Sequence, residues 1–336
     1  MKRVSIKNLA SETNLSKTTI SFILNGKGKE NNISQETINK VQATAKRLNY
    51  QPNYLAKSLS LGKSNTIGLI VPRITDTFFA QIATIMEKKA GEKGYTVVYG
   101  STEELQIKEQ NLIDTFLGKQ VDGLIIASSL QNEEGIKKLH SQHYPFVLID
   151  RFYPTVNTSY VVVKNELGSY NIVNKLLAKN HQNIAMVTIS AYLDLMKDRT
   201  NGYKRALKEY NIPFDPTIIK EVDLYDMENS TNHIIEELLT NPKKIDAIYF
   251  TTHYLASLGF KYLKSKGITI PNDIAICCFG DSPYLEILEP SITAIPMPAE
   301  QIGQEATRIL FNKLELHTDE VEQVILPVQI VERESC

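Results

Sequence analysis

Short apolar segments alternate with longer amphipathic segments from Thr66 to Cys277, and this alternation restricts the possible folds more than any other feature. Largely apolar runs occur at residues 66–71, 122–127 and 184–188, and stretches with helical periodicity separate them. Strands that are apolar throughout are buried on both faces, which is typical of parallel sheets covered by helices. The pattern therefore predicts an α/β fold for this part of the chain.

The alternation divides into two predicted lobes. Strands are expected at residues 66–71, 95–100, 122–127, 146–149, 160–163, 184–188, 246–250 and 274–277, and helices at 76–93, 105–119, 133–142, 166–179, 194–210, 226–239 and 255–266. The alternation restarts at residues 160–163, so this strand is expected to begin the second lobe. Ligands of parallel sheets bind beyond the carboxyl ends of the strands, so the predicted ligand site lies between the lobes.

The first 50 residues have the pattern of a helix-turn-helix. Two short helices each carry one apolar face, made by Ile6, Leu9 and Ala10 in the first and by Ile20, Ile23 and Leu24 in the second. Ser5 and Ser16 are suitable N-caps for them, and Asn25 with Gly26 is a suitable stop. A third helix, capped by Ser34, would complete a three-helix head. In such motifs the second helix enters the major groove of DNA.

Charge is distributed unevenly along the chain. Residues 1–63 contain eleven Lys and Arg and three acidic residues, a net charge of +8. The whole chain carries −1, so the remainder carries −9. Phosphates attract a basic head and repel an acidic body, which favours DNA binding by the head. The alternative is a three-helix head that binds another protein.

Length and composition exclude several classes of protein. A chain of 336 residues is expected to form two or three domains. No segment approaches the ~18 continuous apolar residues of a membrane span. A polar helix, rather than an apolar signal core, follows the basic residues Lys2 and Arg3, so a cytoplasmic protein is expected.

The cysteines and histidines lack the spacing of a metal or catalytic site. Cys277 and Cys278 are neighbours in a predicted strand and point to opposite faces, so buried reduced thiols are expected rather than a disulfide. The six His residues are scattered, and no nucleophile elbow or phosphate loop occurs. We therefore expect no enzyme activity, no metal and no cofactor.

These motifs together resemble the lactose- and galactose-repressor type of bacterial transcription regulators. The most specific matching parts are residues 4–10, 16–26, 33–37, 50–59, 67–79, 150–151, 199–203 and 270–293. The resemblance implies a helix-turn-helix DNA-binding domain at 1–51, a hinge helix and linker at 52–65, and a two-lobed effector-binding and dimerisation domain at 66–336. It also implies a homodimer that binds a pseudo-palindromic double-stranded operator. No heptad run follows Glu332, which favours a dimer over a tetramer joined by a terminal coiled coil.

The resemblance assigns DNA contacts to the head and the hinge. They are Ser5, Ser16, Lys17, Thr18, Thr19, Ser21, Phe22 and Asn25 in the head, and Asn53, Ala56, Lys57 and Leu59 in the hinge. Lys17 can pair with guanine O6 or N7. Phe22 stands where relatives often carry a polar base-reading residue, so it either packs on a thymine methyl or reads no base. Leu59 either wedges into the minor groove and kinks the DNA, or packs within the linker.

Effector contacts are implied in both lobes, at Phe78, Phe79, Asp150, Arg199, Tyr249, Thr252 and Asp281. An aromatic ring at 78 or 79 stacks on a sugar or a base, or else packs the helix that follows. Asp150 accepts two hydroxyl hydrogens, or else pairs with Arg151. Arg199 offers a fixed fork of donors to hydroxyls or carboxylates, and Tyr249 stands where relatives place an aromatic platform.

Three departures from the family pattern affect the predicted effector. Thr252 and His253 replace the usual Asn-Asp pair, Gly280 replaces the first acid of a Gly-Phe-Asp-Asp-like turn, and residues 164–165 read Lys-Asn instead of acid-Asn. Fewer acceptors and more donors suit an anionic or modified sugar. The predicted function is a transcriptional regulator, a repressor, controlled by a sugar or sugar derivative that acts as inducer or corepressor. The alternatives are a solute-binding protein or an enzyme on the same scaffold.

Overall fold

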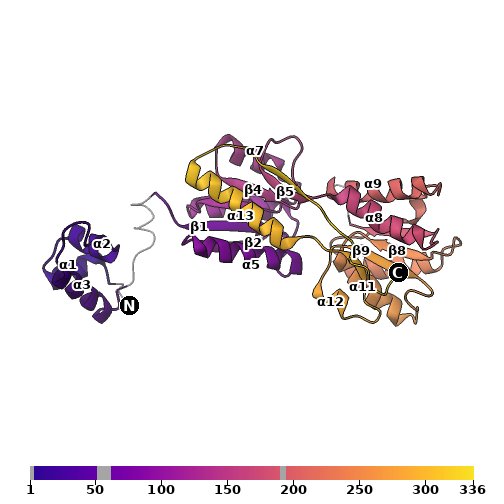
Figure 1. The fold of residues 1–336 in the computed structure, drawn as a ribbon, viewed down its shortest axis with the longest axis horizontal. Coiled ribbons are helices and arrows are strands. Elements are labelled where there is room, and N and C mark those ends of the chain that lie inside the picture. The colour runs from indigo at the N-terminus through magenta and orange to yellow at the C-terminus, as the bar shows by residue number, and fades with distance from the viewer. Residues whose placement is uncertain (1–3, 51–61, 190–193) are drawn as a thin grey trace. The chain divides into compact units, whose positions relative to one another are not determined.

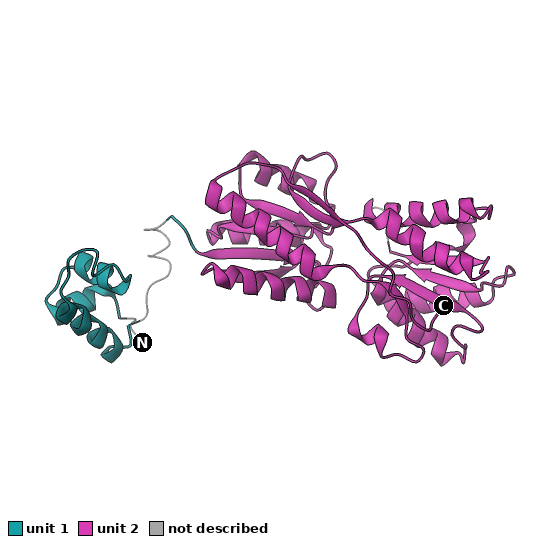
Figure 2. Cartoon of the chain, in the orientation of Figure 1, with its two compact units in different colours: residues 1–64 teal, residues 65–336 magenta. Residues whose placement is uncertain are grey.

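A computed structural model describes residues 4–50, 62–189 and 194–336. The chain forms two compact units, Met1–Ser64 and Asn65–Cys336, which Figure 2 shows in different colours. The predicted hinge contacts Asn53, Ala56, Lys57 and Leu59 lie outside the described residues.

The first unit contains the three predicted helices, α1 (Ile6–Thr13), α2 (Lys17–Leu24) and α3 (Gln35–Arg47). Ser5, Ser16 and Ser34 are their N-caps, as expected from the sequence. Five side chains form the core, namely Leu9, Ile20, Ile23, Ile38 and Val41, and each helix contributes at least one of them. The apolar faces of three short helices thus bury one another, because none of them would be stable alone.

The first lobe of the second unit is built on a parallel six-stranded sheet. In sheet order the strands are β11 (Gln323–Leu326), β5 (Tyr160–Val163), β4 (Phe146–Ile149), β3 (Gly123–Ile126), β1 (Thr66–Val71) and β2 (Thr96–Ser101). On one face lie α5 (Thr77–Glu92) and α13 (Ala299–Leu316), and on the other lie α6 (Gln106–Gly118) and α7 (Glu133–Ser141). Figure 1 shows α13 beside α5 along this lobe.

The second lobe is built on a parallel five-stranded sheet. Its order is β10 (Thr293–Ile295), β9 (Ala275–Phe279), β8 (Ala247–Phe250), β6 (Ile184–Thr188) and β7 (Ile219–Glu221). On one face lie α8 (Asn165–Ala178) and α9 (Asp194–Glu209), and on the other lie α10 (Met227–Leu239) and α11 (His253–Ser265). A short 3-10 turn (Pro216–Ile218) precedes β7, and α12 (Pro283–Glu286) follows β9. Cys277 and Cys278 are buried, unpaired, and face opposite sides of the sheet, as predicted.

The lobes are not consecutive in the chain, which corrects one expectation. Residues 160–163 do not begin the second lobe: β5 pairs with β4 through Leu148–Tyr160 and Ile149–Val161, and with β11 on its other side. After β10 the chain returns to the first lobe through α13 and β11, and Val331 then pairs with Ala294 in the second lobe. Periodicity marks a strand but not its partner, so tertiary pairing decided the sheet to which β5 belongs. Three segments consequently cross between the lobes (Figure 1).

Candidate nucleic-acid interface and inter-lobe site

The amino end of α2 presents the predicted base-reading residues. Ser16 caps the helix by accepting a hydrogen bond from the Thr19 backbone N–H at 3.1 Å, and the two hydroxyl oxygens lie 2.8 Å apart. Lys17 and Thr18 occupy the first turn and are exposed. The unpaired N–H groups and the positive end of the helix dipole favour an anion there, and the Lys17 ammonium adds to that field. This end of α2 is chemically suited to a phosphate or a guanine edge.

The remaining predicted DNA contacts lie along α2 and at the start of α1. Ser21 and Phe22 are half-buried. Asn25 is exposed at the end of α2, and its amide donates to the Ser21 hydroxyl at 3.3 Å. The Ser5 backbone N–H bonds to the Asn8 side chain at 2.9 Å, which fixes the start of α1. The two alternatives for Phe22 both remain predictions.

Arg199 of α9 is the one cation among the predicted effector residues. It is buried, with 3% of its surface exposed. Its Nε donates to Asn165 Oδ1 at 2.9 Å and its Nη1 to the Thr251 carbonyl at 2.5 Å. The guanidinium lies 3.8 Å from the centroid of the Phe279 ring. Burial lowers the pKa of Arg199 to about 10. Among the described residues its hydrogen-bond partners include no carboxylate, and Asp150 and Asp198 attract its charge without a hydrogen bond.

Asp150 and Arg151 form a corner at the end of β4. Asp150 adopts a left-handed backbone conformation, with φ of 65°, and its carboxylate lies 3.3 Å from Arg151 Nε. Arg151 also forms a two-pronged pair with Glu104, at 2.6 and 2.7 Å, and donates to the Ser128 carbonyl at 3.0 Å. Burial raises the pKa of Asp150, against the attraction of Arg151 and Arg199. The pairing predicted as the alternative for Asp150 is therefore present, and an effector contact stays a prediction.

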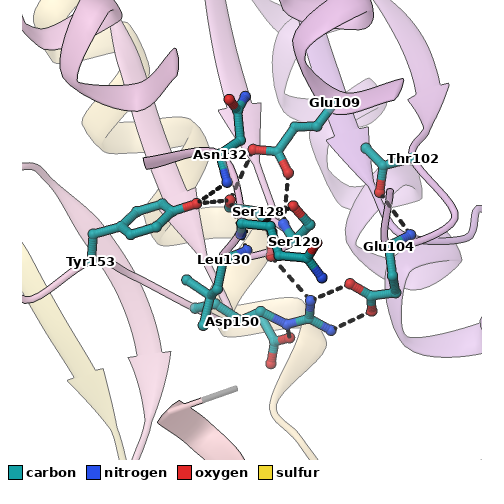
Figure 3. Close-up of polar contacts among 11 residues, drawn as sticks. Thr102, Glu104, Glu109, Ser128, Ser129, Leu130, Asn132, Asp150 and Tyr153 are labelled. Atoms are coloured by element: carbon teal, nitrogen blue, oxygen red, sulfur yellow. Dashed lines mark hydrogen bonds and ion pairs between the residues drawn. The ribbon is translucent and has the colours of Figure 1, made fainter. Parts of the chain in front are cut away.

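A buried polar network adjoins that corner through Ser128, whose carbonyl accepts from Arg151 (Figure 3). Glu109 of α6 is fully buried and accepts from the Ser128 hydroxyl at 2.8 Å and the Ser129 backbone N–H at 2.6 Å. The Tyr153 hydroxyl lies 2.8 Å from the Ser128 hydroxyl and accepts from the Asn132 backbone N–H at 3.0 Å. Burial raises the pKa of Glu109. The network ties together the segments that follow β2, β3 and β4.

The second lobe contributes Tyr249, Thr252 and Asp281. Tyr249 has no exposed surface and its hydroxyl bonds to Ser169, so no aromatic platform is open in this arrangement. Thr252 caps α11 by accepting from the Leu255 backbone N–H at 3.2 Å. Asp281 is paired with Arg333 at 2.7 and 3.1 Å. Effector contact by each of these three residues stays a prediction.

Phe78 and Phe79 stand in the first turn of α5. Their ring centroids are 4.9 Å apart, and both rings belong to the core, with 8% and 6% of their surface exposed. The structure thus gives both rings the packing role that the sequence left as the alternative. Stacking on an effector stays a prediction, limited to the small area that each ring leaves open.

The structure brings five charged or titratable groups together, which we call the inter-lobe cluster: Asp76, Asp150, Arg199, His253 and Asp281. The His253 Nε2 of α11 lies 3.7 Å from the Asp76 Oδ1 at the start of α5, so this pair joins the two lobes. Asp150 interacts electrostatically with Arg199 and Asp76, and His253 with Asp281 and Arg199. The predicted residues Asp150, Arg199 and Asp281 therefore do share one region.

Sequence reasoning missed several members of this region. Asp76 was expected only as the start of a helix, and Asn165, Phe279 and Arg333 were not singled out as partners of predicted site residues. Arg333 lies 52 positions from Asp281, so no local pattern could connect the two. The one available signal was the place of Asp76, which directly precedes a helix that follows the end of a strand.

A pocket of about 400 Å³, lined by Asn171, Asn174 and Lys175 of α8 and by residues 328–330, shares no residue with the inter-lobe cluster. Within the part of the chain that the structure describes, no group of three or more His, Cys, Asp or Glu is arranged to hold a metal ion. No described helix has the length and apolar character that crossing a bilayer requires.

Two protein-family models match the sequence. The model for bacterial regulatory proteins of the lacI family matches residues 5–53, and the model for a periplasmic binding protein-like domain matches residues 173–336. Catabolite control protein A of Priestia megaterium is 32% identical over 335 residues, 99% of each protein.

Solved structures agree with these matches. A LacI family transcriptional regulator from Enterococcus faecium with bound ribose has a TM-score of 0.72 at 25% identity, covering 80% of this chain and 98% of that one. The lac repressor dimer bound to operator and the anti-inducer ONPF has a TM-score of 0.84 at 22% identity, covering 99% of each chain. The head of three helices, the two parallel-sheet lobes and the nearly full-length similarity lead to one conclusion: the chain belongs to the lacI family of bacterial regulatory proteins and is a transcriptional regulator.

Proposed function

We propose that the protein is a homodimeric repressor whose head binds operator DNA and whose two lobes bind a sugar or sugar derivative that controls operator affinity. The observation that carries the effector part is the enclosed Arg199. A buried cation without a bonded carboxylate is costly unless its remaining N–H groups find acceptors. Sugar hydroxyl or carboxylate oxygens are suitable acceptors for a planar guanidinium. The ribose bound to the Enterococcus faecium regulator supports the same class of ligand.

The operator part is supported by the head. Lys17 and Thr18 are exposed at the positively polarised end of α2, and residues 1–63 carry a net charge of +8. Such a surface binds phosphates non-specifically and leaves the first turn of α2 to read bases. The operator bound to the lac repressor dimer supports this assignment. We expect a regulator that acts on bacterial DNA to work in the cytoplasm, and we propose no catalytic activity for it.

The dimer is supported by apolar side chains exposed at one edge of the second sheet. Tyr225, Tyr254 and Tyr284 follow β7, β8 and β9, whose carboxyl ends meet at the same edge because the strands are parallel. Tyr225 is 87% exposed and Tyr284 is 65% exposed. Exposed aromatic residues of this kind are enriched at protein–protein interfaces. We place the contact between subunits at these exposed tyrosines, and leave the largely buried residues of the inter-lobe cluster at the same strand ends to the effector.

Two measurements test the proposal. A thermal-shift screen with ribose, other neutral sugars and acidic sugars detects the effector, because any ligand of the native state raises the unfolding temperature. Fluorescence anisotropy with duplexes from upstream of the protein's own gene and neighbouring operons then measures operator affinity with and without that sugar. A sugar that shifts operator affinity supports the proposal. A protein that binds none of the duplexes, with or without any of the sugars, contradicts it.

The same screen decides between neutral and acidic effectors. Asp281 is already paired with Arg333 and Asp150 with Arg151, whereas Arg199 is held by neutral groups. This arrangement favours a ligand that brings an acceptor to Arg199, such as a sugar acid or a sugar phosphate. Tight binding of a neutral hexose alone would exclude that preference while leaving effector control intact.

A further inference from the structure

Two departures from the family pattern, His253 and Gly280, meet in space. Gly280 follows β9 with φ of +82°, a conformation that side chains rarely adopt. A Cβ at this position would lie 2.9 Å from the His253 Nδ1, which is closer than carbon and nitrogen normally approach. The Gly280 N–H donates to the Ile295 carbonyl at 2.8 Å, so the backbone cannot easily move away. The imidazole therefore has its place only because residue 280 carries no side chain.

The other edge of the same imidazole faces the first lobe. His253 is the first residue of α11, which covers the second sheet, and its Nε2 lies 3.7 Å from Asp76 Oδ1. Asp76 caps α5, which covers the first sheet, by accepting from the Phe78 backbone N–H at 2.9 Å. The separation is slightly longer than a hydrogen bond, so a shift of the lobes by under ~1 Å completes one. The pair thus links the first turns of two helices that belong to different lobes.

We propose that His253 is an inter-lobe latch: its uncharged ring, seated against Gly280, directs the Nε2–H to Asp76 and sets how readily the lobes separate. The latch is a property of the free protein. Its consequence for regulation rests on the function proposed above, because an effector held between the lobes is bound more tightly where the lobes stay together.

Burial, rather than the balance of surrounding charges, favours the neutral form of the ring. Asp76 from α5 and Asp281 from the loop after β9 attract a protonated ring, whereas burial and Arg199 from α9 oppose it, and burial dominates, so the pKa of His253 is lowered. The amino end of α11 acts in the same direction. When the lobes separate, the ring is hydrated and its pKa returns toward the ordinary value of about 6.5. Protonation therefore favours separation: the latch is present above that pH and is lost as the pH falls.

Amide hydrogen exchange of the full-length protein, measured by mass spectrometry at pH 7.5 without sugar or DNA, tests the latch. The probes are the second turns of the two helices, where the Ala80 N–H bonds to the Asp76 carbonyl and the Ala256 N–H to the Thr252 carbonyl. His253→Ala should raise exchange at least about threefold at both positions, because both helix starts lose their partner. His253→Gln should exchange like the natural protein, since its amide N–H reaches the place of Nε2 and does not titrate.

A matched control is His143, an exposed histidine of the first lobe whose Nδ1 lies 2.7 Å from Asp319. His143→Ala should leave exchange at both helix starts unchanged. If His253→Ala raises exchange only in α11 and the adjacent loop, and leaves the start of α5 as it was, the ring packs within its own lobe and the proposal is overturned.

Two further variants keep the test decisive if His253→Ala unfolds. Asp76→Asn retains an oxygen to cap α5 but removes the charge, so it should raise exchange near Ala256 in the opposite lobe; no change there overturns the proposal. Gly280→Ala should raise exchange near Ala80 in the natural background, and add nothing further in the His253→Ala background. Because these measurements use neither sugar nor operator, failure of the proposed regulatory function would leave their interpretation unchanged.

Discussion

Replacing Arg199 with methionine separates effector binding from operator binding. Methionine has a similar length and no charge, so it leaves the Asn165 Oδ1 and the Thr251 carbonyl without the donors that now lie 2.9 and 2.5 Å away. Each buried acceptor left without a partner costs about 1–3 kcal/mol. Removing a buried cation offsets part of that cost, because the guanidinium no longer has to be kept out of water. We expect a net loss of stability of about 1–3 kcal/mol.

Arg199→Met should also lower the affinity for the effector, by more than its cost in folding stability suggests. A charge-assisted hydrogen bond is worth about 1.5–3 kcal/mol, so losing one contact from Arg199 to the effector lowers affinity about ten- to a hundredfold. Isothermal titration calorimetry with the sugar identified in the thermal-shift screen measures this change. Anisotropy with operator DNA should show the affinity of the free protein unchanged, because Arg199 lies in the second unit and the predicted operator contacts all lie within residues 5–59 of the first.

Arg199→Lys is the matched control, since it keeps the charge but loses the planar fork. Its affinity for the sugar should fall between those of the natural protein and of Arg199→Met. The reasoning is refuted if Arg199→Met binds the sugar as tightly as the natural protein does. It is also refuted if Arg199→Met folds normally, as judged by circular dichroism, yet no longer binds operator.

Four further outcomes are expected. Ile20→Ala removes a fully buried side chain from a five-residue core and costs about 2–5 kcal/mol, so the head should unfold and gel shifts disappear while sugar-induced thermal shifts persist; retained operator binding would contradict this packing role. Lys17→Ala should weaken operator binding and, if Lys17 contacts phosphate, reduce the slope of log K against log salt by about 0.9; an unchanged affinity removes Lys17 from the interface. Burial raises the pKa of the Cys277 and Cys278 thiols, so Ellman's reagent should fail to label either until denaturant is added, and rapid labelling of the folded protein would show that they are accessible. Lowering the pH from 7.5 to 5.5 should reduce the protection of the amides near Ala80, corrected for the slower intrinsic exchange at low pH, in the natural protein but not in His253→Gln, because only the imidazole gains a proton; equal responses would exclude the histidine as the titrating group.

The fold was largely predictable because each lobe is a repeat of one local pattern. The strands 146–149, 160–163 and 184–188 begin and end as expected, since an apolar run bounded by polar residues leaves little freedom. Some helix starts differ by one or two residues from the expected ones: α11 begins at His253 rather than Leu255, because Thr252 caps it by accepting from the Leu255 N–H. Pairing of β5 and the return of α13 and β11 to the first lobe could not be predicted, because contacts between distant segments leave no period in the sequence.

The sequence predicted three residues that the structure brings into one region, Asp150, Arg199 and Asp281, but their roles toward an effector stay predictions. Arg199 was expected to offer donors to an effector; the structure encloses it and directs two of its N–H groups to Asn165 and the Thr251 carbonyl, so the effector contact stays a prediction. Phe78 and Phe79 were expected either to stack on a ligand or to pack their helix, and Tyr249 to form a platform; the structure buries most or all of each side chain. Burial depends on which helix covers which face, and the residue type alone does not specify it.

The sequence alone therefore determined the basic head, the helix-turn-helix, the α/β class and the family resemblance. Each of these depends on local spacing, capping or summed charge, which a chain carries whether or not it is folded. The tertiary structure decided which strands share a sheet, which carboxylates are neutralised by Arg151 and Arg333, and that His253 occupies the space left by Gly280 opposite Asp76. Those features join residues far apart in the chain, and only the packing of the folded lobes brings such residues within reach of one another.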